Sequence, residues 1–213
     1  MLLPYTSPFA KEYLATANNT LSNTSQYFDR AKGVDYAIQY AENNNPMYAY
    51  FWIGGDCTNF ASQILLAGGV KMHDEMWPDT EQGWWYRGAG TNKADCSISW
   101  KNADRFVRYM GTNGNEYTSF YTFASKLMSG DHIALDFESD GNWNHMGFVT
   151  YIGGYNTYYY YDDDNVRHSK YYRDFAVAQH TSNYHAWTSS DNNNWEKADG
   201  SARYAIVRRG ATA

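Results

Sequence analysis

The sequence predicts an α+β domain in which helices pack on an antiparallel β-sheet. Helix-type patterns fill the first half of the chain, and strand-type patterns fill the second half from about residue 130. Neither a repeat nor a linker divides the 213 residues, which are enough for one sizeable core. We therefore expect a polar N-terminal lead-in over residues 1–26 and a single domain over residues 27–213.

Two helices are expected before the first conspicuous motif. Residues 10–17 fit a short helix within the lead-in, and residues 29–43 fit a longer one that Asp29 can cap. Apolar residues of the longer helix recur at helical spacing: Ala31, Val34, Ala37, Ile38 and Ala41. Pro46 disfavours helix in the residue before it, so this helix should end there. The aromatic stretch 48–53 that follows should be extended.

The segment 54–63, which reads GGDCTNFASQ, predicts a tight turn that opens a helix. Glycines permit the turn, and Asp56 is a good N-cap because its carboxylate can accept orphan N–H groups. An apolar helix face follows at the expected spacing: Cys57, Phe60, Ala61, Ile64 and Leu65. Gly68 and Gly69 supply the stop signal.

This arrangement places Cys57 in the first turn of a helix. The positive end of a helix favours the thiolate and lowers the pKa of a thiol, so Cys57 is a candidate nucleophile. The local sequence supports equally well a small buried residue at the start of a core helix. The second cysteine, Cys96, completes no metal-binding motif, so we expect two free thiols and a structural role for Cys96.

The remaining chain is expected to form a long surface loop, a helix and a series of strands. Tryptophans and tyrosines without clear period over residues 70–100 indicate the loop, and residues 100–110 fit the helix. The expected strands span 131–137, 144–152, 157–161, 175–180 and 202–207. The acidic run 162–165 should be a solvated turn. Calcium binding there is an alternative, although the spacing does not match an EF-hand loop.

A nucleophilic cysteine requires a base and a group that orients the base. His145 begins a strand after a turn, where its ring would face a cleft, so it is the first candidate for the base. His180 ends a strand that can neighbour His145, and it is the candidate orienting group. Asn144 and Asp163 are alternatives for that role. Each histidine taken alone also fits an ordinary surface or core position.

Composition limits the partners. The formal net charge of −6 offers no basic excess to neutralise phosphates, so we expect no nucleic-acid partner. No apolar run approaches the ~20 residues of a transmembrane helix, and no signal-peptide pattern opens the chain. Aromatic residues make up 18% of the chain, which fits a ring-rich core or a surface that stacks on sugars. Few lysines and arginines beside many polar residues fit an extracellular protein.

Several blocks of the sequence resemble the Putative amidase domain family of bacteria, grouped with the NlpC/P60-like, papain-like cysteine hydrolases. The blocks occur in the family's order: residues 30–41, 50–69, 130–131, 140–150 and 178–184. The resemblance implies a papain-like fold with Cys57 as nucleophile and His145 as base. It also implies His180 as the third catalytic residue.

The resemblance further implies a hydrolase of amide bonds, with cell-wall peptide as the expected substrate. We expect Tyr50, Asp56, Trp143 and Asn144 to contact that substrate. No metal or other cofactor is expected, since no side-chain spacing fits zinc. The protein should be a monomer that is extracellular or associated with the wall. Two alternatives remain: a non-catalytic domain that binds glycan through its Trp and Tyr loops, and a thioester-forming acyltransferase.

Overall fold

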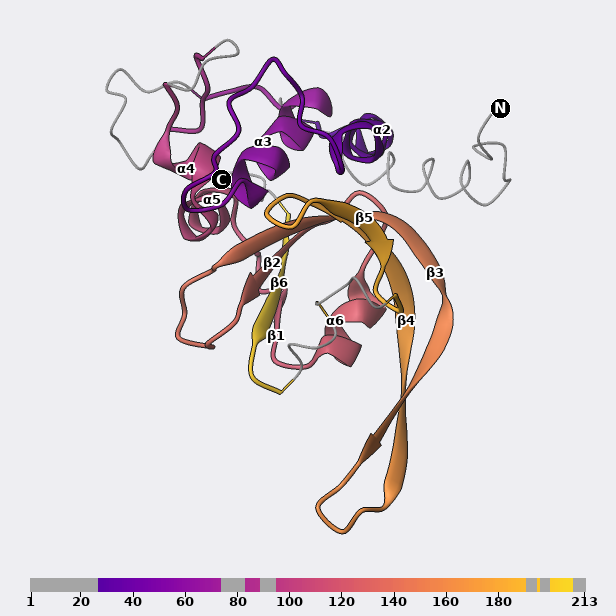
Figure 1. The fold of residues 1–213 in the computed structure, drawn as a ribbon. Helices are drawn as coiled ribbons and strands as arrows, with labels where there is room; N and C mark the ends of the chain where they lie inside the picture. The colour runs from indigo at the N-terminus through magenta and orange to yellow at the C-terminus, as the bar shows by residue number, and fades with distance from the viewer. Residues whose placement is uncertain (1–26, 74–82, 89–94, 191–194, 196–199, 209–213) are drawn as a thin grey trace, which may run out of the picture.

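Six strands form one antiparallel sheet in the structure, a computed structural model that describes residues 27–73, 83–88, 95–190, 195 and 200–208 (Figure 1). The strand order is β1-β6-β2-β3-β4-β5. The strands are β1 (Glu116–Tyr117), β2 (His132–Asp136), β3 (His145–Tyr161), β4 (Arg167–Gln179), β5 (Tyr184–Trp187) and β6 (Arg203–Val207). The expected α+β architecture with an antiparallel sheet is therefore confirmed.

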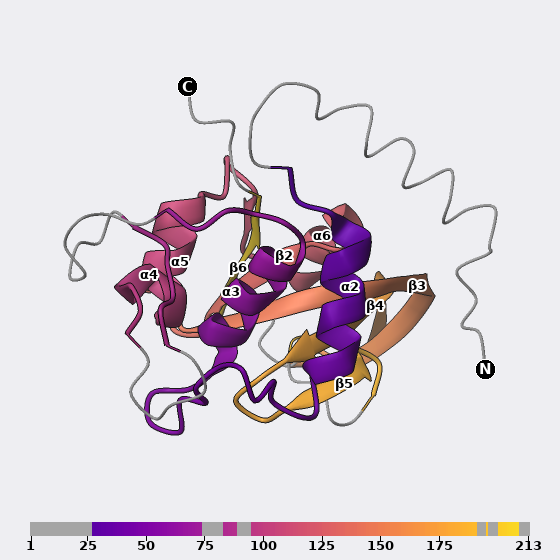
Figure 2. The ribbon, with the colours of Figure 1, turned by 90° about the horizontal axis from the view of Figure 1, so that it is seen from above.

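Helices cover both faces of this curved sheet. On one face lie α2 (Arg30–Tyr40), α3 (Cys57–Ala67), α4 (Ile98–Lys101) and α5 (Ala103–Met110) (Figures 1 and 2). The short helix α6 (Phe120–Lys126) lies within the curve of the opposite face. Side chains alternate between the two faces along each strand, so one strand contacts both helix layers. In β2, Ala134 packs with α3 and α5, whereas Ile133 and Leu135 pack with α6.

Helix α3 is buried on every side from Cys57 to Leu65, which is more than the single apolar face expected from the sequence. Its polar side chains are satisfied by neighbouring elements. The bonds join Asn59 to Trp100 (2.8 Å), Ser62 to Trp84 (2.9 Å) and Gln63 to Tyr36 (2.7 Å). The motif residues around Cys57 thus hold the helix in the core, because a buried polar group without a partner would destabilise the fold.

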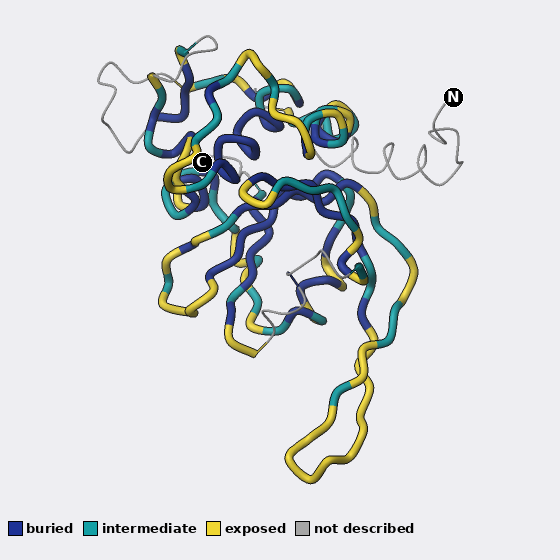
Figure 3. The backbone as a smooth tube through the Cα atoms, in the orientation of Figure 1, coloured by how far each residue is buried: buried dark blue, intermediate teal, exposed yellow. Residues whose placement is uncertain are grey.

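The strands expected at 144–152 and 157–161 are one strand, β3. Gly153 and Gly154 do not end it; the pairing with β4 shifts register between Ile152 and Tyr155 and then continues. The strand expected at 175–180 is likewise the last part of the longer β4. Residues 155–173 thereby form a two-stranded arm that reaches beyond the body and is largely exposed (Figures 1 and 3).

The rings expected in a surface loop over residues 70–100 are core residues where the structure describes them. Trp84, Trp85 and Trp100 are at most 1% exposed. Isolated bridges join His73 to Trp84 and Tyr86 to Cys96. The expected helix at 100–110 is present as α4 and α5. The lead-in and its expected helix at 10–17 lie outside the described residues, and none of the described helices has the length and apolarity to cross a membrane.

Candidate active site

Cys57 is the first residue of α3, as the sequence predicts. The preceding turn depends on two glycines with positive φ, 85° at Gly54 and 90° at Gly55, which residues with a side chain rarely adopt. A Cβ on Gly55 would also lie 2.9 Å from the hydroxyl of Thr181, at the turn after β4. The backbone N–H of Asp56 donates to that hydroxyl (2.7 Å). The cysteine loop is thus held directly against the end of the sheet.

Asp56 has a different role from the two that the sequence analysis gave it. Its carboxylate makes no capping bond to α3, and its 1% exposure leaves no surface for a substrate. Its Oδ1 accepts from the backbone N–H of Phe51 (2.9 Å) and from Nδ2 of Asn59 (2.8 Å). These bonds close the loop that presents Cys57.

Cys57 and His145 form the central pair. Burial raises the pKa of the Cys57 thiol, but the hydrogen bond and charge of His145, together with hydrogen bonds from the Met146 backbone and the Thr58 side chain, lower it by more, so the net pKa lies below the ordinary value. Burial lowers the pKa of His145, but the hydrogen bond with Cys57, its charge and a bond to Gln179 raise it by more. Both shifts favour a thiolate beside an imidazolium.

Gln179, on β4, orients the imidazole. Its Oε1 lies 2.9 Å from Nε2 of His145 and 3.0 Å from Nε1 of Trp195. An indole N–H can only donate, so the Gln179 atom that faces it must be the oxygen. Nε2 of His145 must then carry a proton and donate it to the same oxygen. This fixes the tautomer of neutral His145 and leaves Nδ1 as the position for a proton from Cys57.

His180 does not contact His145 and does not take the orienting position expected of it. It is fully buried and stacks on Phe60, with 3.9 Å between ring centroids. Its Nε2 donates to the carbonyl of Tyr40 (2.8 Å), and its Nδ1 lies 2.5 Å from Oδ2 of Asp56. His180 therefore connects the end of β4 to α2 and to the cysteine loop.

Strand alternation explains the difference between the two neighbours on β4. Phe148 pairs with Ala178, so Gln179 follows on the face of β3 that carries His145, whereas His180 turns toward α3. In the sequence, Gln179 stands inside the block 178–184 and nothing local distinguishes it from its neighbours. The two-residue period was the available signal, but it selects between neighbours only when the register with β3 is known.

Trp195 is a residue of the site that the sequence did not predict. It lies in the segment after β5, far in sequence from both catalytic candidates, and no local pattern marks it. Its ring centroid lies 5.8 Å from that of His145. Gly147 makes room for it, because a Cβ there would lie 2.7 Å from Cζ2 of Trp195.

A cavity of about 470 Å³ opens beside the thiol. Gly54, Cys57 and Thr58 form one wall, residues 101–105 at the start of α5 form another, and residues 142–144 before β3 form a third. Of the four residues expected to contact substrate, Trp143 and Asn144 lie in this lining. Tyr50 does not, and its hydroxyl donates to Asn183 (2.8 Å) on the His180 side.

The alternative orienting groups lie elsewhere. Oδ1 of Asn144 accepts from the backbone N–H of Phe137 (2.8 Å), and Asp163 is exposed at the tip of the arm.

Both cysteines are free, as expected, and burial raises the pKa of Cys96 to about 11. Within the described residues, no three side chains of the His, Cys, Asp and Glu types group closely enough to hold a metal ion.

The chain matches a known protein family over most of its length. The sequence profile of the Putative amidase domain family matches residues 27–207, which include every residue of the site described above. The chain is 35% identical over 123 residues to the uncharacterized protein YhbB of Bacillus subtilis. That alignment covers 57% of this chain and 37% of the relative, so the chain spans little more than a third of the relative's length. No solved structure matches.

Proposed function

The chain belongs to the Putative amidase domain family, and on that premise we propose that it is a cysteine-dependent amide hydrolase of the NlpC/P60-like, papain-like kind. The observation that supports the cysteine mechanism is the connected set of Cys57, His145 and Gln179. The thiol lies at a helix N-terminus, the base begins a strand, and the orienting amide comes from the next strand. We assign the third position to Gln179 in place of His180.

The reaction follows from these roles. Nδ1 of His145 takes the thiol proton, and the Cys57 thiolate attacks the carbonyl carbon of the amide. The backbone N–H of Cys57 has no partner within the helix and can stabilise the developing oxyanion. The C–N bond breaks as His145 returns its proton to the leaving amine. Water then gives a proton to His145 and attacks the thioester, which releases the acid and restores the thiolate.

The proposed substrate is a bacterial cell-wall peptide, in keeping with the NlpC/P60-like resemblance. The corresponding location is extracellular or at the wall, the protein acting as a monomer without a cofactor. Glycan binding through tryptophan loops has less support, because Trp84, Trp85 and Trp100 are in the core. An acyltransferase would share every step up to the thioester and differ only in the acceptor.

The proposal is tested by incubating the purified protein with soluble peptidoglycan fragments and mapping new amino groups by mass spectrometry. Cys57→Ser should reduce cleavage by at least about a thousandfold, because a neutral hydroxyl is a far weaker nucleophile than the thiolate. Cys96→Ser is the matched control and should retain activity. Cleavage that persists in Cys57→Ser would exclude the mechanism. Transfer to an added amine in preference to water would identify an acyltransferase.

A further inference from the structure

The hydroxyl of Thr58 contacts the reacting sulfur, although the reaction described above gives it no step. Oγ1 of Thr58 lies 3.8 Å from Sγ of Cys57, which is within hydrogen-bond range for sulfur. Thr58 is 1% exposed and belongs to the lining of the cavity beside the thiol. It therefore borders both the nucleophile and the space that a substrate would enter.

The fold itself makes no use of this hydroxyl. Within the described residues, Sγ of Cys57 is its only hydrogen-bond partner. Other buried hydroxyls have structural partners: Ser62 of α3 donates to the carbonyl of Trp100 (2.9 Å), and Thr150 of β3 donates to that of Ala176 (3.2 Å). A buried hydroxyl is unfavourable unless it is paired, so the contact with the nucleophile is what accounts for a threonine here.

The proton count fixes the direction of the bond. The thiol has one proton, and its hydrogen bond to His145 uses that proton. Once His145 has taken the proton, the sulfur is an anion that can only accept. The Thr58 hydroxyl is therefore the donor in both states, and its bond strengthens when the sulfur becomes charged.

Attack on the amide moves the negative charge from the sulfur to the carbonyl oxygen. That oxygen is then only two bonds from Sγ. The hydrogen of a hydroxyl turns about the C–O bond to suit its acceptor, so the same donor can follow the charge. The backbone N–H of Cys57 lies in the adjacent residue, and the two groups together would make a site with two donors for the oxyanion.

We infer that Thr58 is a further catalytic residue, whose hydroxyl donates to the Cys57 thiolate before attack and to the oxyanion after it. Thr58 keeps its own proton throughout, because His145 carries the proton that is transferred. The inference rests on the proposed function in taking Cys57 as the nucleophile of an acyl transfer. It adds a second donor beside the backbone N–H of Cys57.

The role at the thiolate is tested by the pH profile of the reaction of Cys57 with hydroxyethyl disulfide, followed by mass spectrometry. Thr58→Val removes the donor at similar shape, so less thiolate forms but each thiolate is more nucleophilic. The rate should fall about 2- to 4-fold on the acid limb and rise about 2- to 4-fold on the alkaline plateau. The two profiles then cross, which lost packing alone would not produce. Parallel profiles would overturn the inference.

The titratable and charged groups around Cys57 are the same in every variant. His145 faces the sulfur from β3, and Asp56 precedes Cys57 in the chain and is paired with His180. Three further charges line the cavity from α4 and α5: Lys101, Asp104 and Arg105. A difference between two profiles therefore reports the substitution at Thr58.

Matched variants separate the hydroxyl from the packing of the side chain. Thr150→Val makes the same substitution at a fully buried position whose hydroxyl pairs with Ala176 and His185, and its profile should superimpose on that of the wild type. Thr58→Ser retains the donor and should also follow the wild type. Thr58→Ala removes the donor if Thr58→Val does not fold. Equal profiles of Thr58→Val and Thr150→Val would overturn the inference.

The role at the oxyanion is tested with a peptide aldehyde, acetyl-alaninal. The Cys57 thiolate adds to the aldehyde carbon, the C=O electron pair moves to the oxygen, and no group leaves. The adduct protects Cys57 from iodoacetamide. Thr58→Val should need at least about 10-fold more aldehyde for equal protection, because the adduct oxygen loses a donor. A change no larger than that seen with the disulfide would overturn the inference.

Amide cleavage gives the corresponding kinetic measurement. Thr58→Val should lower kcat/KM on soluble peptidoglycan fragments by about 100-fold, far more than it changes the reaction with the disulfide, which forms no oxyanion. Crossing profiles and weaker aldehyde protection in a protein that cleaves none of these fragments would support the inference and contradict the proposed substrate alone.

Discussion

The half of the β3–β4 hairpin that lies in the body of the protein, its near half, differs in burial from the half that reaches beyond the body, its far half. In its near half, Phe148, Val149, Val177 and Ala178 are fully buried, and the strand ends carry His145 and Gln179. In its far half, the arm of residues 155–173, most side chains are exposed (Figure 3). Both halves have the same pairing, so backbone hydrogen bonds alone do not account for the difference.

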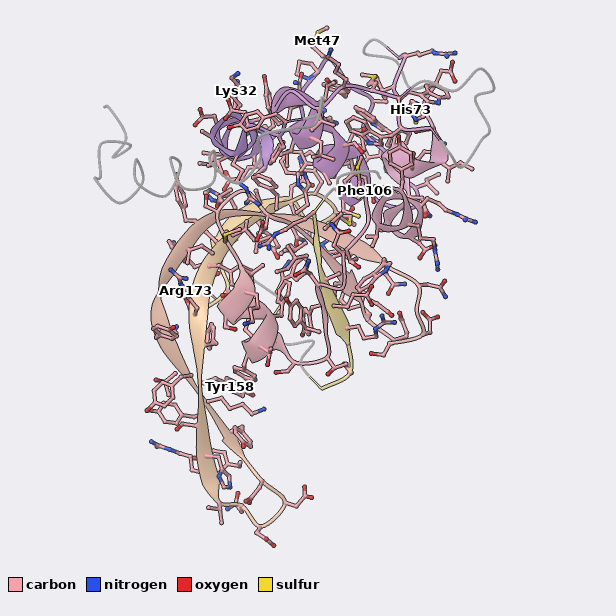
Figure 4. All side chains as sticks on the ribbon, turned by 180° about the vertical axis from the view of Figure 1, so that it is seen from behind. Lys32, Met47, His73, Phe106, Tyr158 and Arg173 are labelled. Atoms are coloured by element: carbon pink, nitrogen blue, oxygen red, sulfur yellow. The ribbon has the colours of Figure 1, made fainter. Side chains whose placement is uncertain are left out.

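Aromatic residues show the contrast most clearly. On the arm, Tyr155 is 79% exposed and Tyr171 is 70% exposed. Arg167 lies over the ring of Tyr159, 4.3 Å from its centroid, which is a contact within the arm. Figure 4 shows Tyr158 and Arg173 along the arm, away from Phe106 in the core. Layers on both sides fix a side chain in the near half, which is what a catalytic geometry requires.

The largest expected effect concerns the residue that ends the near half. His180→Ala removes one partner of a fully buried pair with Asp56 and the stacking on Phe60. The free energy of unfolding should fall by about 3–5 kcal/mol, because Asp56 is left buried without its partner. Urea denaturation measures this. A loss below about 1 kcal/mol would show that the pair does not anchor the hairpin.

The second effect is on the thiol that the near half activates. The pKa of Cys57 is lowered and that of His145 is raised, so the ion pair exists from below the ordinary thiol pKa up to the pKa of His145. Alkylation of Cys57 should therefore begin at a lower pH than that of a free thiol. At pH 7 it should exceed alkylation of Cys96, with a pKa of about 11, by at least about 100-fold. Similar pH profiles for the two thiols would exclude activation by His145.

Gln179→Ala should reduce kcat/KM for amide cleavage by about 10- to 100-fold, because His145 loses the acceptor that selects its tautomer. The pH profile of Cys57 alkylation should shift upward at the same time, which a purely structural role for Gln179 would not produce. Glutamate at this position accepts the same hydrogen bond, so Gln179→Glu should recover part of the rate. An unchanged rate in Gln179→Ala would remove it from the site.

Two glycines of β3 provide a matched pair. A Cβ at Gly147 would lie 2.7 Å from the Trp195 ring and 3.0 Å from Val177, whereas a Cβ at Gly154 would meet nothing within 4 Å. Gly147→Ala should lower the free energy of unfolding by about 1–3 kcal/mol, as overpacking does. Gly154→Ala should change it by less than about 0.5 kcal/mol. Thermal denaturation compares them, and equal losses would contradict the difference in packing at the two positions.

The smallest effect belongs to the arm. Tyr155→Ser and Tyr171→Ser remove exposed rings far from Cys57 and should leave amide cleavage within about twofold and stability within about 0.5 kcal/mol. The cleavage assay on soluble peptidoglycan fragments, run with the denaturation assay, checks both values. A larger loss of cleavage would show that the arm contacts the substrate.

The sequence was most informative where local chemistry determines structure. The Gly-Gly turn and the apolar spacing after it predicted the start of α3 at Cys57, and the turn before His145 predicted the start of β3. Both signals act within a few residues. The predicted end of β3 at residue 152 was wrong. Gly153 and Gly154 resemble a stop signal, but pairing with β4 continues the strand past them.

The parts of the site that could not be predicted depend on contacts between distant segments. Asp56 is a residue type that commonly caps helices, but here its carboxylate pairs with His180 and makes no capping bond. Gln179 and His180 are adjacent, and only the register of β4 on β3 assigns one to His145 and the other to α2 and α3. Trp195 reaches the site from a segment whose sequence gives no indication of its position.

The bond between Asp56 and His180 joins residues that are 124 positions apart in the chain. Loop closure over that distance needs β4, which leaves the ribosome late. Until then the cysteine loop lacks its anchor, and His145 lacks the acceptor on Gln179 that orients it. A nascent or unfolded chain therefore carries an ordinary, weakly reactive cysteine, and the reactive thiolate arises only with the completed fold.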